Sequence, residues 1–382
     1  MPMPEKAVEI VVSSEELKRT LECIALISGG GGKKQDDAAK QSMAALRIVA
    51  VSPYKDGNYM LSFGCTGMAE QLTYRMEGKA YGATAPVDIY VERKRFIALG
   101  KTFTGDVRLI FAANELQIFV ESSQYNLTTV NAALPELRVP DGGVQLPTSF
   151  LLDAMKHCSA VIPKEAAGPW SSIQIKIAPD GSAVCWGARH VAAAKYVVPS
   201  TGCNAELNLL LLPLNIQHIA ELAEMDPVRL VKTDQGVYVN APRFDYFCNN
   251  IIGAFPDCER MAGKNKAAKS INIAKVKLLA AITRAAVIAG DEATSRIKLC
   301  SDTENLYIEV ESVAGSGIES VPIDNVDGKD DDAFYMPAAM LSRLIYNLPS
   351  DSITLSTNGR ISPVFLRAAG SDSFYICAPV RG

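Results

Sequence analysis

One pattern recurs three times along the chain, and it constrains the fold more than any single motif. Amphipathic segments begin near residues 13, 147 and 272, and each places apolar residues at helical spacing. A second helical segment begins near residues 91, 212 and 336. Short runs of alternating apolar and polar residues lie between these segments, with turn signals such as Asn358-Gly359. Such a repeat predicts one supersecondary unit used three times.

The repeat predicts an α+β protein of three domains, residues 1–142, 143–269 and 270–382. In each domain two helices are expected to pack on antiparallel strands. The joints are the polar, loop-like stretches at residues 138–147 and 261–270. Equivalent helices in near-equal repeats are expected to line one surface of a pseudo-symmetric assembly.

Composition excludes several classes of protein. Hydrophobic residues make up 48% of the chain and charged residues 21%, which is typical of a globular protein with an ample core. No apolar run approaches the roughly 18 residues that a membrane span needs, and no secretory signal is visible. Nine cysteines without CxxC pairs indicate reduced thiols in a cytosolic protein. The net charge of −4 argues against a tight, static nucleic-acid binder but allows local basic patches.

Motifs for catalysis and metal binding are missing from the sequence. The three histidines, His157, His190 and His218, do not stand at metal-ligand spacing, and neither HExxH nor GxSxG occurs. We therefore expect a protein that is not an enzyme and that has no catalytic residue, no metal and no cofactor.

The stretch LISGGGGKKQDD at residues 26–37 raises the alternative of a nucleotide hydrolase. A P-loop requires GxxxxGK followed by Ser or Thr, between a strand and a helix. Here Lys33 is followed by Lys34 and Gln35, and the glycines follow a predicted helix. Gly29 is better interpreted as the stop of that helix. The hydrolase is therefore the least favoured alternative.

Four motifs point to one known family. They are YNLTTVNAALPEL near residue 125, WGARHVAAAKY near residue 186, GAFPDCERM near residue 253, and the terminal FYICAPVRG. With these motifs in this order on a threefold repeat, the chain resembles the bacterial sliding clamp family, the beta subunit of the replicative DNA polymerase, over essentially its whole length. The resemblance implies a cytoplasmic, nucleoid-associated processivity factor. Its implied partners are double-stranded DNA, the replicative polymerase, the clamp loader, and repair proteins with short clamp-binding motifs.

The resemblance also implies a head-to-tail homodimer, in which six domains close a ring around the duplex and the helices line the hole. A threaded ring does not need a tight grip, so an acidic protein can slide on weak, salt-screened phosphate contacts. The alternative is a clamp-fold scaffold that binds peptides without stable ring closure.

Basic residues on the repeat helices and in nearby loops are the candidate DNA contacts. Lys277 and Arg284 are seven residues apart on one helix face, and His157 stands beside Lys156. For each residue taken alone, a position on a solvated helix face is about as good an interpretation as contact with DNA. As a set on equivalent helices they favour phosphate contacts, which carry no sequence information. The set is Lys18, Arg19, Lys33, Lys34, Lys156, Lys164, Lys277 and Arg284.

The resemblance implies a hydrophobic partner-peptide pocket between the second and third domains. The alternative is that the same apolar residues merely seal the domain joint. Trp186 replaces a small polar residue of the family pattern, and Ala188-Arg189-His190 replaces Gly-His-Arg, so the partner motif is expected to differ from the usual one. The matching positions are Trp186, Ala188, Arg189, His190, Val191, Pro256, Arg260, Met261, Ile361, Pro363, Ile376, Cys377, Ala378, Pro379, Val380 and Arg381.

The resemblance implies a dimer interface between an edge strand of the first domain in one copy and the end of the third repeat helix in the other. Tyr125 and Leu127, on an expected edge strand, match one side, and Ile288 and Ala289 match the other. The alternative for each is ordinary core. Ala289 is smaller than the usual family residue, so this interface is expected to bury less apolar area and close less firmly.

Overall fold

The computed structural model of the chain describes residues 8–28, 37–51, 58–82, 85–112, 114–163, 168–263, 267–290, 296–328 and 333–380. Its helices and antiparallel strands form an α+β fold. Contacts group the chain into two compact units, Met1–Thr148 with Gln217–Asn250 and Ser149–Ile216 with Ile251–Gly382. Among the described helices, none has the length and apolar character needed to cross a membrane.

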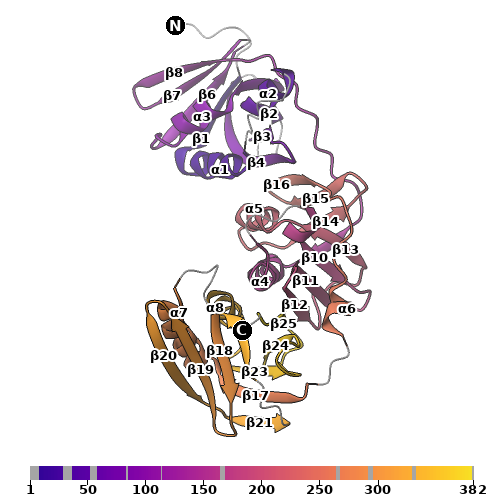
Figure 1. Ribbon diagram of the computed structural model, residues 1–382. Helices are drawn as coiled ribbons and strands as arrows, with labels where there is room; N and C mark the ends of the chain where they lie inside the picture. Colours follow the sequence, from indigo (N-terminus) through magenta and orange to yellow (C-terminus); the bar gives the residue numbers. More distant parts are fainter. Residues whose placement is uncertain are drawn as a thin grey trace. The chain divides into compact units, whose positions relative to one another are not determined.

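The first unit is built on a twelve-stranded sheet (Figure 1). Its main path runs β8-β7-β6-β1-β4-β16-β15-β14-β9, and β3, β2 and β5 branch from β4. The strands are β1 (Val8–Ser13), β2 (Ala45–Val51), β3 (Tyr59–Thr66), β4 (Glu70–Gly82), β5 (Val87–Glu92), β6 (Asp106–Phe111), β7 (Glu115–Val120), β8 (Ser123–Thr128), β9 (Val144–Leu146), β14 (Val228–Lys232), β15 (Gly236–Ala241) and β16 (Phe244–Asn249).

Strand β4 is long enough to join strands of two predicted domains in this sheet. One part of β4 pairs with β1, with Ala80 opposite Ile10, and another part pairs with β16, with Tyr74 opposite Phe244. The sheet therefore continues from the first predicted domain into strands of the second.

Helices α1 (Ser14–Leu26), α2 (Asp37–Ala44) and α3 (Arg93–Gly100) belong to the first unit. Helix α1 begins where the Ser13 hydroxyl accepts a hydrogen bond from the Glu16 amide at 3.4 Å, which satisfies one free N–H of the first turn. Leu17 and Leu21 recur at helical spacing and are fully buried. Helix α3 approaches α1 so closely that a Cβ at Gly100 would lie 2.2 Å from Leu21 Cδ1, so a larger residue would require the Leu21 side chain to move.

The second unit contains a nine-stranded sheet and a four-stranded sheet. The larger runs β13-β10-β11-β12-β25-β24-β23-β17-β21, and the smaller runs β20-β19-β18-β22. Their strands are β10 (Ile173–Ile177), β11 (Ala183–Arg189), β12 (Ala192–Val198), β13 (Leu207–Leu211), β17 (Lys269–Ala274), β18 (Arg296–Ser301), β19 (Asn305–Ser312), β20 (Gly315–Pro322), β21 (Asn325–Gly328), β22 (Phe334–Pro337), β23 (Ser352–Thr357), β24 (Val364–Ala368) and β25 (Phe374–Cys377).

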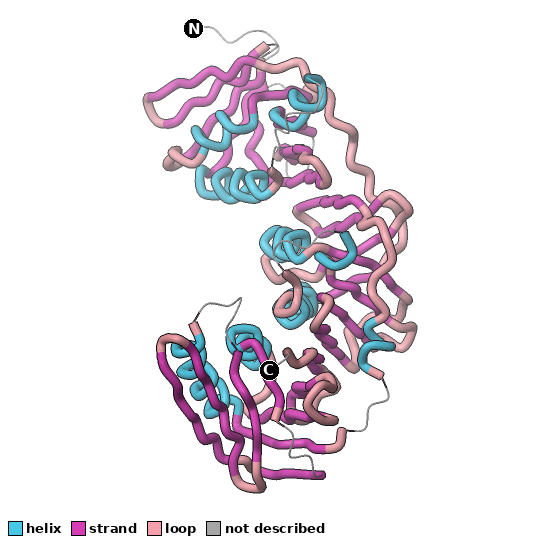
Figure 2. Tube along the Cα trace, in the orientation of Figure 1, coloured by secondary structure: helices cyan, strands magenta, loops and turns pink. Residues whose placement is uncertain are grey.

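The larger sheet also crosses a predicted domain joint, because β12 pairs with β25 through Ala193 and Ile376. Helix α4 (Thr148–Cys158) lies close to this sheet, and a Cβ at Gly187 of β11 would lie 2.4 Å from the Cys158 carbonyl oxygen. Helices α7 (Lys275–Ala289) and α8 (Ala338–Tyr346) lie side by side, and α7 packs on β19 and β20 (Figures 1 and 2). The remaining helices are α5 (Pro213–Ala223) and the short α6 (Cys258–Ala262).

The structure confirms the six predicted repeat helices, α1, α4 and α7 with α3, α5 and α8. Two short helices, α2 and α6, were not predicted. Helix α1 ends at Leu26 with Ile27 as its C-cap, and Ile27 is buried. Gly29, which the sequence suggested as the stop of this helix, lies outside the described residues. The three-domain boundaries remain a prediction, because sheet pairing across both joints groups the contacts into two units.

Candidate functional site

Three lysines on the repeat helices are available for an external anion. Lys156 on α4 and Lys277 on α7 are exposed, and Lys18 on α1 is half-buried. Among the described residues none of the three forms an ion pair within 4 Å. That these lysines contact DNA stays a prediction.

The two arginines of the predicted DNA-contact set are already paired with carboxylates. Arg19 of α1 forms an ion pair with Glu224, which follows α5. Arg284 of α7 donates two parallel hydrogen bonds to Glu319 of β20, at 2.7 and 2.6 Å. This fork lowers the pKa of the Glu319 carboxyl through the Arg284 hydrogen bond. Both arginines are therefore paired within the chain, which the sequence did not indicate.

The remaining members of that set, and the neighbouring His157, are placed differently from these residues. Lys33, Lys34 and Lys164 lie outside the described residues. His157, expected beside Lys156 on the helix face, is instead 2% exposed and stacks on Tyr375 with ring centroids 4.3 Å apart. The expectation that His157 faces DNA is wrong, because its position on α4 turns it toward β25.

Two exposed cations of the second helices were missed by the sequence interpretation. Lys94 of α3 and Arg343 of α8 are both exposed. Neither forms a side-chain ion pair among the described residues. Helical periodicity already placed both on the polar side of their segments, and this signal could have found them.

Several residues of the predicted peptide pocket lie in the interior. Trp186 is 1% exposed, and Ala188, Ile376 and Cys377 are also buried. Trp186, Ala188 and Ile376 belong to an aromatic cluster with Ala193, Cys258, Phe365 and Phe374. Trp186 meets Phe374 edge to face, with centroids 6.0 Å apart. For these residues the structure agrees with the alternative of a sealed joint, because an indole in place of a small side chain fills the space.

Other residues of the predicted pocket remain accessible around this aromatic cluster. Met261 follows Cys258 on α6, Ile361 precedes β24, and Val191 accepts a hydrogen bond from the Ala378 amide at 2.8 Å. The exposed residues are His190, Val191, Arg260, Met261, Ile361 and Val380; the half-buried residues are Arg189, Pro256, Pro363, Ala378 and Pro379; Arg381 lies outside the described residues.

The sequence interpretation missed two cations and an aromatic residue at the cluster. Lys195 Nζ lies 5.6 Å from the ring centroids of both Trp186 and Phe374, and Arg367 Cζ lies 4.8 Å from that of Phe374. Trp170 packs against the cluster from the side. Trp186 of β11 and Lys195 of β12 are opposite each other across paired strands. The alternation of residues within each strand does not reveal this neighbour, so the pairing of the two strands was needed to find it.

The residues of the predicted dimer interface lie at or beside free sheet edges. Tyr125, 39% exposed, and half-buried Leu127 are on β8, the edge strand of the first unit's sheet. Ile288 and Ala289 are half-buried at the end of α7, and Ile288 lies beside Gly317 of the edge strand β20. An edge strand offers unpaired main-chain donors and acceptors to another chain.

No family model matches the chain, and no curated protein matches it. Among solved structures, the chain is similar to the DNA polymerase sliding clamp of Bacillus subtilis at 16% identity and a TM-score of 0.85, covering 99% of this chain and 100% of that one. It is similar to the sliding clamp, DNA polymerase III subunit beta, of Pseudomonas aeruginosa bound to griselimycin at 16% identity, a TM-score of 0.83 and coverage of 99% and 100%. It is also similar to the beta subunit of Thermotoga maritima DNA polymerase III at 16% identity and a TM-score of 0.78, covering 98% of this chain and 100% of that one. The chain therefore has the sliding-clamp fold from end to end.

Proposed function

We propose that this chain is a DNA sliding clamp, two copies of which close a ring around duplex DNA and hold a replicative polymerase on its template. The observation that carries the proposal is the likeness of fold to the Bacillus subtilis sliding clamp over 99% of the chain. Low identity at full coverage means that the architecture is retained while most side chains differ. Such a protein acts as a tether and performs no chemistry of its own.

The free edges of the two units support ring closure. Strand β8 ends one sheet and strand β20 ends another. An antiparallel pairing of β8 in one copy with β20 in a second copy would satisfy the main-chain groups of both edges. It would bring Tyr125 and Leu127 toward Ile288 and Ala289. Two such contacts complete a closed, head-to-tail dimer of six predicted domains.

The charge distribution supports sliding contacts with DNA. Lys18, Lys156 and Lys277 each stand on the first helix of a repeat without an internal ion pair among the described residues. Because the chain carries a net charge of −4, contacts from so few lysines are weak and salt-screened. Weak phosphate contacts suit a ring that moves along DNA without reading its sequence.

The surface around the aromatic cluster is the proposed docking site for the polymerase, the loader and repair proteins. Ile361 is 89% exposed and Met261 37% exposed, and both lie next to segments that pack on the cluster. Apolar side chains with cations such as Arg260 and Arg367 beside them suit a short peptide with apolar anchors. The buried Trp186 leaves less depth there than a small residue would.

A processivity assay tests the proposal directly. Primed single-stranded circular DNA is copied by the replicative polymerase and clamp loader of the same cell, with and without this protein. We expect products of full circle length only when the protein is present. Unchanged product lengths with an active loader and polymerase would refute the clamp function.

A clamp-fold scaffold without ring closure is the second candidate, and one observation favours it. The outward face of α7 carries Val276 and Val287, 73% and 79% exposed, while Arg284 on the same helix is neutralised by Glu319. Such a face is less basic than a DNA channel needs. Sedimentation at micromolar protein separates the two candidates, because the scaffold is expected to be monomeric and the clamp dimeric.

A further inference from the structure

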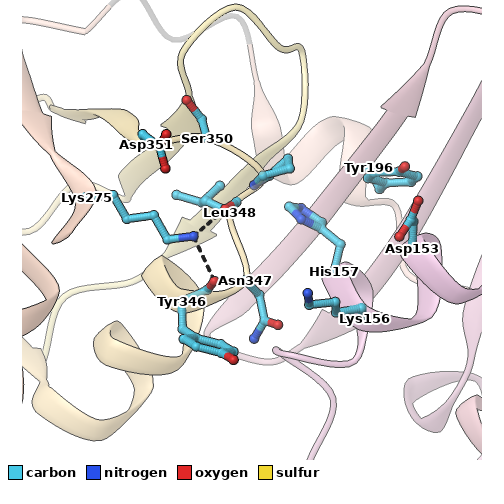
Figure 3. Close-up of a pocket in the computed structure, with 11 residues that line it drawn as sticks. Asp153, Lys156, His157, Tyr196, Lys275, Tyr346, Asn347, Leu348, Ser350 and Asp351 are labelled. Atoms are coloured by element: carbon cyan, nitrogen blue, oxygen red, sulfur yellow. Dashed lines mark hydrogen bonds between the residues drawn. The ribbon is translucent and has the colours of Figure 1, made fainter.

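A cavity of about 460 Å³ lies on the helical side of the second unit, and its lining includes Lys156, one of the candidate DNA contacts. It opens between α4, Tyr196 of β12, the start of α7 and the segment that follows α8 (Figure 3). Its lining residues are Asp153, Lys156, His157, Tyr196, Lys275, Tyr346, Asn347, Leu348, Pro349, Ser350 and Asp351.

One wall of the cavity carries a hydrogen-bond acceptor without a donor. Tyr375 Oη lies 3.1 Å from His157 Nδ1 and 3.1 Å from the His157 carbonyl oxygen. Tyr375 has one hydroxyl proton, and when it is donated to the carbonyl, Nδ1 must carry a proton and donate to Oη. Both contacts are then satisfied by the Nδ1–H tautomer, which leaves Nε2 unprotonated.

The Nε2 atom of His157 is buried and has no hydrogen-bond partner among the described residues. Figure 3 shows the imidazole between Tyr196 and Leu348. Burial lowers the pKa of His157 to about 4, so the ring is neutral at pH 7. A buried acceptor without a donor destabilises the fold, and a ligand N–H or O–H would offset that loss.

Two lysines of the lining supply positive charge: Lys156 from α4, the helix that also carries His157, and Lys275 from the start of α7. Lys156 has no ion pair among the described residues, and its ammonium is exposed. Lys275 Nζ donates to the carbonyl oxygens of Tyr346 at 2.9 Å and Leu348 at 2.7 Å, which leaves one of its three protons for a ligand. Burial lowers the pKa of Lys275; the Asp351 carboxylate opposes this shift, and the charge of Lys156 adds to it. A bound anion between the two ammonium groups would relieve their repulsion.

Aromatic surface and carboxylates complete the lining. Tyr346 is 63% exposed at the end of α8, so its ring face is open to stacking. Asp153 and Asp351 balance the two lysines and disfavour a ligand with several negative charges. The lining therefore suits a ligand with one anionic group, a flat ring and a ring amine.

From these features we propose that the cavity binds a nucleoside monophosphate or a single unpaired nucleotide of a DNA strand. The base stacks on Tyr346 and donates from its exocyclic amine to His157 Nε2, and the phosphate lies between Lys156 and Lys275. A cavity of about 460 Å³ falls within the roughly 300–1,000 Å³ range of small-molecule sites. The site does not require ring closure, a loader or a polymerase.

Titration calorimetry of the full chain with dAMP tests the proposal, with inorganic phosphate and deoxyadenosine as separate probes. We expect dAMP to bind more tightly than either fragment. Lys156→Met should weaken dAMP binding about tenfold, which corresponds to 1.4 kcal/mol. Lys101→Met, which removes an exposed lysine at the end of α3, outside the cavity, should leave dAMP binding unchanged.

Nitrogen NMR of histidine gives a second, independent readout. We expect the His157 Nε2 resonance to move from an unprotonated, free position toward that of a hydrogen-bonded acceptor when dAMP is added, while Nδ1 stays protonated. Absence of dAMP binding at millimolar concentration, equal binding of dAMP and phosphate, or an unmoved Nε2 resonance would each overturn the proposal. All these measurements use small molecules and no polymerase or loader, so a failed processivity assay would leave their outcome unaffected.

Discussion

The salt dependence of DNA binding should separate the unpaired lysines from the paired arginines. Each phosphate contact made by a basic side chain contributes about 0.9 to the slope of log Kobs against log salt. In a dimer each substitution removes two copies, so Lys18→Met, Lys156→Met or Lys277→Met should each reduce the slope by up to about 1.8. The double variant Arg284→Met/Glu319→Gln removes a neutral pair and should reduce it far less.

The assay is fluorescence anisotropy of a labelled short duplex, titrated with protein at several salt concentrations. The double variant is the matched control, because it keeps the net charge of the chain while removing the fork between Arg284 and Glu319. Sedimentation of each variant checks that the dimer is intact. The reasoning would be refuted if the double variant lowered the slope as much as the lysine variants, or if none of the lysine variants changed it.

Three further predictions concern burial, packing and the sheet edge. Burial lowers the pKa of His157 to about 4, against about 6.5 in the unfolded chain. Because the unfolded chain takes up the proton first, the free energy of unfolding should fall by up to about 3 kcal/mol as pH falls from about 6.5 to 4, and an NMR titration midpoint near 6.5 would contradict this. Gly187→Ala should cost about 1–3 kcal/mol in urea unfolding, since its Cβ would lie 2.4 Å from the Cys158 carbonyl oxygen, whereas Gly64→Ala, with its nearest contact at 3.7 Å, should cost less; equal costs would contradict the close approach. Ile318→Lys, at a position 73% exposed on edge strand β20, should weaken self-association in sedimentation velocity, and unchanged association would count against pairing through this edge.

Local patterns in the sequence were sufficient for the repeat and its helices. Apolar residues at helical spacing, such as Leu17 and Leu21, predicted α1, because a helix forms where one face can be buried. Apolar residues at every second position predicted strands such as β3, because alternate side chains of a strand point to opposite faces of the sheet and one face can be buried. The family resemblance implied that Tyr125 lies on an edge strand, and β8 is an edge of its sheet in the structure.

The tertiary structure alone decided which of the candidate residues are available to a partner. Arg284 forms an ion pair with Glu319, and Trp186 is buried in contact with Phe374. His157 turns from a predicted DNA contact into a buried acceptor through Tyr375. These pairings join residues far apart in the sequence, and helix or strand periodicity carries no information about such neighbours. Periodicity determines which face of an element is buried, whereas the packing of elements determines what that face meets.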